Sequence, residues 1–281
     1  MSPIRKVLLH VPTFPDAISG RTLESACALV RLLGSKLTVQ VPQLDRSEST
    51  WPAVMGAFPL DFPQLMTETV LRSEANAAEA CENLTRLCAG HGISFDLRRV
   101  LSTLYAPPAL FVDLARLHDL VILPLPEGFD REYVEAAIFD SGRPVVLIPS
   151  TGRPLTSLNR ILLAWDYSRE AARALSDSLP ILARAPEVHV VTVLGEREIA
   201  TTSAPTDLET YLGAHGVKFK RNRIELDGKN IGECLMRHAA EIDADMVVMG
   251  AYGHNRLREF VLGGATQSVL RAPSLPVFLS H

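Results

Sequence analysis

The chain has 281 residues, of which 47% are hydrophobic and 21% charged, and its formal net charge is −4. This composition is typical of a globular protein with enough chain for about two domains. The slight acidic excess argues against nucleic acid as a partner, because binding to a phosphate backbone normally needs a basic surface. No apolar run approaches the roughly 18 residues of a membrane-spanning helix, so we expect neither a membrane span nor a signal peptide.

Four cysteines are spread over segments with helical patterns and form no CxxC pair: Cys27, Cys81, Cys88 and Cys234. This spacing favours reduced thiols in the core over disulfides or a metal site. We therefore expect a cytoplasmic protein without a bound structural metal ion.

The first half alternates short runs rich in Val, Ile and Leu with segments of helical period. The apolar runs are KVLLHVP from residue 6, KLTVQV from 36, DLVILP from 119 and RPVVLIPS from 143. Residues 45–65 interrupt this alternation with DRSESTWPAVMGAFPLDFPQL, which contains three prolines. We expect this insertion to pack over its own domain, with a lid or a partner-binding segment as the alternative.

The second half repeats the first in the same order. RILLAWD from residue 160, EVHVVTV from 187, DMVVMG from 245 and LPVFLSH from 275 match the four runs above. A fifth matching pair is CAGHGISF at 88–95 and LGAHGVKF at 212–219, each a helix end followed by the start of a strand. Five matched segments in one order indicate an internal duplication.

The elements of the second half can be assigned from these patterns. We expect strands at 161–165, 188–193, 218–226, 246–249 and 277–279, and helices at 169–183, 206–214, 231–242 and from about 265 onward. Ser168 is the candidate N-cap of the first of these helices. Leu175, Leu179 and Leu182 form one apolar face of that helix, although Pro180 argues against a regular geometry.

Apolar strands separated by helices are typical of parallel sheets that are buried on both faces. We therefore predict an α/β protein with two tandem, doubly wound, five-stranded parallel-sheet domains of Rossmann-like type. The N-terminal domain would comprise residues 1–153 and the C-terminal domain residues 157–281. GRPLTS at 152–157 is a suitable linker, so the boundary falls near residue 154.

The segment VVMGAYGHNRLREFVLGGATQSVL, residues 247–270, places glycines after a predicted buried strand. The carboxyl ends of parallel strands are where open α/β folds bind ligands. Gly250 and Gly253 suit a tight turn, and Gly263 and Gly264 precede a helix whose N–H groups favour phosphate. Without a ligand, the same glycines would indicate only two turns and a helix start. Three basic residues add local positive charge: His254, Arg256 and Arg258.

This segment resembles the signature of the universal stress protein family, Gly-x2-Gly-x9-Gly followed by Ser or Thr. Gly250, Gly253 and Gly263 fall at those spacings. ADMVVMG resembles the strand that leads into the signature, and WDYS at 165–168 resembles the end of the family's first strand. The resemblance covers essentially the whole chain in two copies, so it implies a tandem universal stress protein.

In nucleotide-binding members of that family, an acid after the first strand and backbone after the second hold adenine, while the glycine signature holds ribose and phosphates. The resemblance thus implies a site for ATP or another adenine nucleotide, with Mg²⁺ accompanying ATP. It assigns the base end to Asp166 and Val193, and the ribose and phosphates to Met249, Gly250, Gly253, His254, Arg256, Gly263, Gly264 and Thr266. Gly264 departs from the signature, because the family has Ser or Thr at this position. Loss of that hydroxyl donor to a charged phosphate oxygen costs about 1.5–3 kcal/mol of binding free energy.

The first half carries unsuitable residues at the matching positions. Pro12, Pro124 and Glu127 stand where the second half has Asp166, Gly250 and Gly253. Proline supplies no N–H and glutamate repels phosphate, so we expect this site to be disabled. Asp16 and Gly128 lie nearby in the sequence and leave binding of another ligand as a weaker alternative. His10 is expected to be an ordinary hydrogen-bonded histidine.

We predict a nucleotide-responsive binding module, with a non-nucleotide structural or interaction protein as the alternative. Slow ATP hydrolysis is a third, weaker interpretation, because the glycine segment offers only Glu259 as an acid. No catalytic residue is therefore predicted. The chain has no GxGxxG after its first strand, no GxxxxGK[ST], no GxSxG and no HExxH, which argues against those enzyme classes.

Members of the family often associate through their last strands. In this chain the corresponding segments are residues 145–148 and 277–279, which would meet within one molecule as a pseudo-dimer. The resemblance also implies a homodimer.

Overall fold

The structure is a computed structural model that describes residues 3–45, 62–103, 108–125, 131–195, 205–228, 230–251, 264–271 and 273–281. Within those ranges the chain forms ten strands and eight helices. The strands are β1 (Lys6–His10), β2 (Lys36–Leu44), β3 (Phe95–Ser102), β4 (Leu120–Leu125), β5 (Val145–Pro149), β6 (Arg160–Ala164), β7 (Glu187–Leu194), β8 (Phe219–Glu225), β9 (Met246–Gly250) and β10 (Val277–Ser280). The helices are α1 (Gly20–Leu33), α2 (Phe62–His91), α3 (Ala109–Ala115), α4 (Arg131–Phe139), α5 (Arg169–Leu182), α6 (Pro205–Ala214), α7 (Ile231–Glu241) and α8 (Gly264–Arg271).

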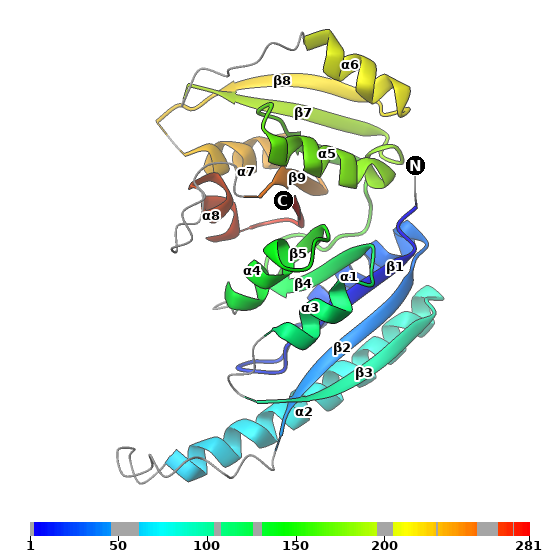
Figure 1. The fold of residues 1–281 in the computed structure, drawn as a ribbon, viewed down its shortest axis with the longest axis vertical. Coiled ribbons are helices and arrows are strands. Elements are labelled where there is room, and N and C mark those ends of the chain that lie inside the picture. The colour runs from blue at the N-terminus through cyan, green and yellow to red at the C-terminus, as the bar shows by residue number, and fades with distance from the viewer. Residues whose placement is uncertain are drawn as a thin grey trace.

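All ten strands belong to one sheet, in the order β3-β2-β1-β4-β5-β10-β9-β6-β7-β8 (Figure 1). Within each half the neighbouring strands are parallel and the order is the same, which is the doubly wound arrangement predicted from the repeat. The halves meet where β5 and β10 pair antiparallel, with Val146 opposite Phe278. The predicted pairing of these strands within one chain is confirmed, and the two predicted sheets are halves of one continuous sheet.

Helices cover both faces of this sheet. One hydrophobic core contains residues of α1, α2, α5 and α6, together with strand residues such as Val7, Leu163 and Phe278. On the other face, α3, α4 and α8 pack around Leu8 and Leu279, and α7 packs over β6 and β7. The two larger cores contain residues of both halves, so the division into residues 1–153 and 157–281 stays a prediction.

The duplication recurs in local geometry at matching positions. Asp119, just before β4, accepts hydrogen bonds of 2.8 and 2.9 Å from two backbone N–H groups at the start of β1. Asp245, just before β9, accepts corresponding bonds of 2.6 and 3.1 Å at the start of β6. Gly92 and Gly216 follow α2 and α6 with φ values of 65° and 70°, the left-handed conformation that ends many helices. The two halves therefore share capping chemistry as well as strand order.

The predicted elements of the second half are present within one residue of their expected bounds. Ser168 caps α5 as predicted, since its Oγ accepts a hydrogen bond of 3.0 Å from the Ala171 N–H. Helix α5 continues through Pro180, because a proline near the helix end removes only one backbone bond. The insertion at 45–65 ends inside α2, which begins at Phe62, and its residues 46–61 lie outside the described residues.

The four cysteines are free and buried, as predicted, and they lie in α1, α2 and α7. Among the described helices, none combines the length and the apolar character that a membrane crossing needs.

His118 is a buried histidine between α3 and β4, with only 3% of its surface exposed. Its Nδ1 lies 2.8 Å from the Leu114 carbonyl oxygen and its Nε2 lies 3.0 Å from the Thr38 hydroxyl. A carbonyl oxygen only accepts, so Nδ1 carries the proton of the neutral ring and Nε2 accepts from Thr38. Burial lowers the pKa of His118, and the positive charges of Lys6 and Arg98 contribute to the lowering.

We expect the protein to lose stability as the pH falls below the usual histidine pKa of about 6.5. In that range the unfolded chain binds a proton at His118 that the folded chain does not, so the stabilisation is complete only at higher pH. Urea unfolding between about pH 8 and pH 5 should show a weaker pH dependence for His118→Gln, by at most about 1.4 kcal/mol per pH unit. Parallel pH profiles for the variant and the wild type would contradict this prediction.

Candidate functional site

Four of the predicted nucleotide-binding residues lie at the carboxyl edge of the second-half strands. Asp166 follows β6, Val193 lies near the end of β7, and Met249 and Gly250 end β9. Because β9, β6 and β7 are neighbours in that order, these residues share one edge of the sheet. The structure thus brings them together as the sequence predicts. Four other predicted residues lie outside the described residues: Gly253, His254, Arg256 and Gly263.

The turn between β6 and α5 orients Asp166. Its Oδ1 accepts a hydrogen bond of 2.9 Å from the Ser168 N–H, and Tyr167 between them has a left-handed backbone with φ 63°. Thr192 of β7 donates from its hydroxyl to the Trp165 carbonyl at 2.9 Å, which ties this turn to the neighbouring strand. Asp166 is exposed, so its carboxylate is held by the backbone and faces solvent.

Gly250 lies against the first turn of α5. A Cβ built at Gly250 would be 2.5 Å from the carbonyl carbon of Glu170 and 2.7 Å from the backbone nitrogen of Ala171. These are backbone atoms, so they cannot move aside as a flexible side chain would. Only glycine therefore permits this close approach between β9 and the N-terminus of α5.

Gly232, near the start of α7, allows a second close approach. A Cβ there would be 2.7 Å from the Ala265 carbonyl oxygen and 2.7 Å from the Ser268 Cβ, both in α8. Asn230 caps α7, since its Oδ1 accepts a hydrogen bond of 2.9 Å from the Glu233 N–H. The N-terminal turns of α7 and α8 are therefore in contact.

Three helices, α5, α7 and α8, thus begin at the carboxyl edge of β6 and β9. Each helix start has unpaired N–H groups and about half a positive charge. The caps Ser168 and Asn230 satisfy one N–H each at α5 and α7, and the cap position of α8 lies outside the described residues. The adjoining N-termini of α7 and α8 on one face of the sheet, and the start of α5 beside the end of β9 on the other face, favour an anion at this edge.

Thr266 in the first turn of α8 is 3% exposed and already has an interaction within the protein. Its predicted contact with a phosphate stays a prediction. No group of three or more His, Cys, Asp or Glu within the described ranges is arranged to hold a metal ion.

At the same edge of the first half, α2 covers the ends of β1 and β2. Thr13 donates from its hydroxyl to the Pro42 carbonyl at 2.7 Å and lies 2.8 Å from the Ser73 hydroxyl of α2. Asn76, also in α2, donates to the Thr13 carbonyl at 2.9 Å. Thr13 and Ser73 are buried. The hydroxyl groups of Thr13 and Ser73 are therefore satisfied within the protein, and the predicted loss of a site in the first half stays a prediction.

The other first-half predictions have mixed outcomes. His10 is buried and hydrogen-bonded, with Nδ1 3.1 Å from Gln40 Oε1, as predicted. Pro124 lies within β4. Asp16 is exposed in the turn after β1. Glu127 and Gly128 lie outside the described residues, so their contribution stays a prediction.

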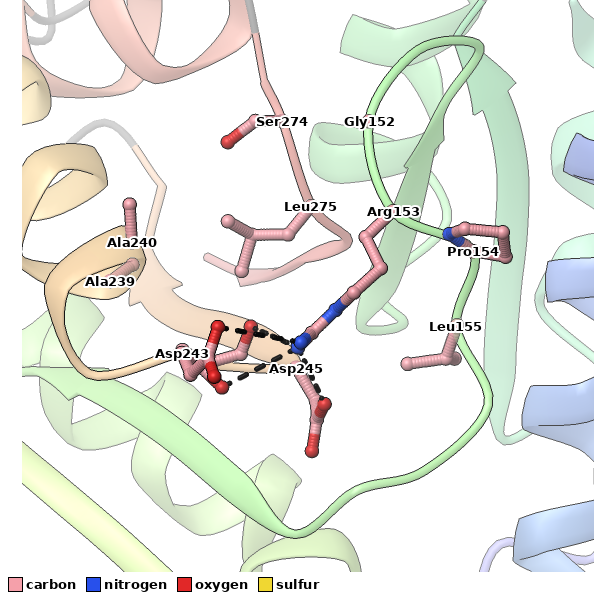
Figure 2. A pocket seen from close by; sticks show the side chains of 11 residues that line it. Gly152, Arg153, Pro154, Leu155, Ala239, Ala240, Asp243, Asp245, Ser274 and Leu275 are labelled. Carbon is pink, nitrogen blue, oxygen red and sulfur yellow. Dashed lines mark hydrogen bonds and ion pairs between the residues drawn. The ribbon is translucent and has the colours of Figure 1, made fainter.

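A cavity of about 260 Å³ lies at the linker between the halves (Figure 2). Its walls are the linker residues 152–155, the end of α7, residues 243–245 just before β9, and residues 274–275. Arg153 reaches across the cavity to Asp245 Oδ1 at 2.9 Å and to the Ala244 carbonyl oxygen at 3.2 Å. The cavity is at the opposite end of β9 from Gly250, so it is separate from the predicted site.

Comparison with known proteins agrees with this fold. Residues 157–281 match the model of the universal stress protein family. Universal stress protein Slr1230 of Synechocystis sp. is 29% identical over 147 residues, which are 51% of this chain and 49% of that protein. The chain therefore spans about half the length of the curated relative that it matches.

Two solved structures resemble the chain over nearly its whole length. A universal stress protein from Archaeoglobus fulgidus DSM 4304 has a TM-score of 0.67 and 18% identity, with 97% of each chain covered. A functionally unknown protein from Pseudomonas aeruginosa PAO1 has a TM-score of 0.56 and 16% identity, with 99% of this chain and 92% of that chain covered. Residues 157–281 are thus similar to the universal stress protein family, and the full length of the chain has the fold seen in the Archaeoglobus structure.

Gly232 was not singled out from the sequence, although a signal was present. A glycine inside a helix lowers stability by about 1 kcal/mol relative to alanine. A glycine two residues after the Asn230 cap therefore indicates a packing constraint. The contact with Ala265 supplies that constraint.

We expect Gly250→Ala to destabilise the protein by about 1–3 kcal/mol, because the added methyl group meets fixed backbone atoms of α5. The matched control is Gly213→Ala in α6, where an added Cβ has no neighbour within 4 Å. This control should be neutral or stabilising by about 0.5–1 kcal/mol. Urea unfolding at neutral pH would measure both, and equal effects would refute the close-packing explanation.

Proposed function

We propose that the protein is a regulatory module that binds an adenine nucleotide, ATP or AMP, at the carboxyl edge of its second-half strands. The observation that carries this proposal is that α5 begins just after Asp166, while α7 and α8 begin in contact with each other at the same edge of the sheet. A nucleotide has a base with hydrogen-bonding groups at one end and phosphate charge at the other. The edge offers a carboxylate and backbone groups for the first and helix N-termini for the second.

At the base end, Asp166 would accept a hydrogen bond from the exocyclic amino group of adenine. Its carboxylate is already oriented by the Ser168 N–H, so little side-chain entropy is lost on binding. Val193, the next-to-last residue of β7, would contribute backbone groups and an apolar contact to the ring.

At the phosphate end, the glycine signature and the start of α8 would supply backbone N–H groups. Met249 and Gly250 lead into the signature, and Gly263, Gly264 and Thr266 would surround the phosphates. His254 and Arg256 would add positive charge, and Mg²⁺ would accompany ATP. Gly264 removes the hydroxyl that the family signature has at this position, which favours fewer phosphate contacts than in a member with Ser or Thr there.

The proposed action is regulation through binding. A ligand regulates a protein when it binds one of two states more tightly, and α8 is the described element best placed to report occupancy, because it contacts α7 and shares a core with α4. No enzymatic step is proposed. The second candidate, an interaction protein without a nucleotide, is favoured only by Gly264 in place of the signature hydroxyl.

The cellular setting is also proposed from the family. We infer a cytoplasmic protein that works as an intramolecular pseudo-dimer or as a homodimer. Members of the family often associate through their last strands. In this chain β5 and β10, the last strands of the two halves, already pair with each other.

The direct test is thermal unfolding and calorimetric titration with ATP, AMP and no ligand. A nucleotide at about 100 times its dissociation constant should stabilise the folded protein by about 2.7 kcal/mol. Absence of any shift at millimolar ATP and AMP would refute the proposed function and favour the interaction protein.

Asp166→Asn should lower nucleotide affinity roughly tenfold or more, because the amide loses the negative charge that attracts the adenine amino group. Asparagine can still accept the hydrogen bond from the Ser168 N–H, so the turn is kept. Asp113→Asn is the control, since Asp113 is 68% exposed and pairs with Arg116 in the first half. Unchanged affinity of Asp166→Asn in a protein that binds ATP would remove the base-end assignment.

A further inference from the structure

Two pairs of equivalent positions distinguish the halves at their carboxyl edges. Leu9 of β1 lies opposite Ile122, and Leu163 of β6 lies opposite Val248, so the next residues in β1 and β6 occupy equivalent places. These next residues are His10 in the first half and Ala164 in the second.

The second pair lies on the helices that precede the last strands. Tyr133 in α4 and Ala265 in α8 are equally far in sequence from Val145 and Val277, the first residues of β5 and β10. Both are partly buried and pack against the same hydrophobic core. The second half therefore has alanine at both positions where the first half has a ring.

In the first half these two rings are stacked on each other. The centroids of His10 and Tyr133 are 4.9 Å apart and the ring planes differ by 19°. Phe111 of α3 closes the cluster, 4.9 Å from His10 and 5.8 Å from Tyr133. His10 is 4% exposed and Phe111 2%. Offset stacked rings of this kind add attraction beyond the burial of their surface.

The polar edge of His10 is also satisfied within the protein, because its Nδ1 lies 3.1 Å from Gln40 Oε1 of β2. The flat, hydrogen-bonded ring of His10 is thus held between the end of β1, a central strand, and the first turns of α3 and α4. This is the chemistry that a flat heterocyclic ligand would present at the same place in the second half.

We propose that His10 and Tyr133 are a built-in occupant of the first-half ligand place, and that Ala164 and Ala265 are what leave the second half able to take a flat ligand. This inference rests on the proposed function and deepens it. It explains why a ligand would bind in the second half and not in the first by the ring volume of His10 and Tyr133. This effect adds to the backbone N–H groups that Pro12 and Pro124 lack. It also implies one nucleotide per chain.

The first experiment moves the occupant into the second half. Calorimetric titration of the full chain with ATP should give about one site per chain, and Ala164→His/Ala265→Tyr should bind ATP at least roughly tenfold more weakly. The control, Ala89→His/Ala214→Tyr, adds the same side chains at exposed helical positions and should bind as the wild type does. Wild-type affinity in the site variant would overturn the inference. If that variant does not fold, Ala265→Leu adds volume at one position only and should still weaken binding.

The second experiment does not depend on nucleotide binding. Tyr133→Ala should lower the unfolding temperature, and 4-methylphenol, the tyrosine side chain as a free molecule, should restore part of the loss. The same compound should not affect Tyr211→Ala, because Tyr211 is 39% exposed. Absence of selective restoration would overturn the assignment of a ring-filled place.

The two experiments separate the two proposals. A wild-type chain that binds neither ATP nor AMP would refute the proposed function, and with it the role of Ala164 and Ala265. The 4-methylphenol result would then still decide whether His10 and Tyr133 fill a ring-sized place in the first half.

Discussion

The antiparallel pairing of β5 with β10 is the contact on which the rest of the structure depends. Both strands are buried along their whole length, and Phe278 is fully buried opposite Val146. Without this pairing each half would expose an apolar strand edge, which is an aggregation hazard. The edges that remain are β3 and β8, which carry exposed Arg98, Arg99 and Lys220 among other charges and so resist further pairing.

This junction also brings helices of both halves into one core next to the proposed site. Helix α4 of the first half and α8 of the second pack on one core around β5 and β10. The first half is further fixed to the second by Arg184, which donates to the Leu33 carbonyl at 2.9 Å, and by the Leu155 N–H, which donates to Ser25 at 3.2 Å. The first half therefore supplies part of the core on which α8 packs.

Fold and site differ in how far the sequence predicts them. The strand order follows from the repeat, because apolar runs of strand length and the Gly92 and Gly216 helix ends occur twice in one order. Asp166 and Gly250 could be placed at one edge, because parallel strands end together. The stack of His10 on Tyr133 could not be predicted, since these residues are far apart in sequence and meet only through tertiary packing. The same holds for Gly232 against α8.

The two halves differ at the ends of β9 and β4, where one has Gly250 and the other has Pro124. The lengths of two turns explain this difference. Residues 165–168 are all that separate β6 from α5, so the first turn of α5 is held against the end of β9, where only glycine fits. Residues 11–19 separate β1 from α1, and this longer turn does not force α1 against the end of β4. Pro124 is tolerated there, because it lies beyond Ile122, the last β4 residue paired with β1, and its missing N–H breaks no bond of that ladder. A short turn thus demands Gly250 for packing alone, whether or not a ligand binds there. The longer turn removes that demand, so the first half keeps its fold with proline at the matching position.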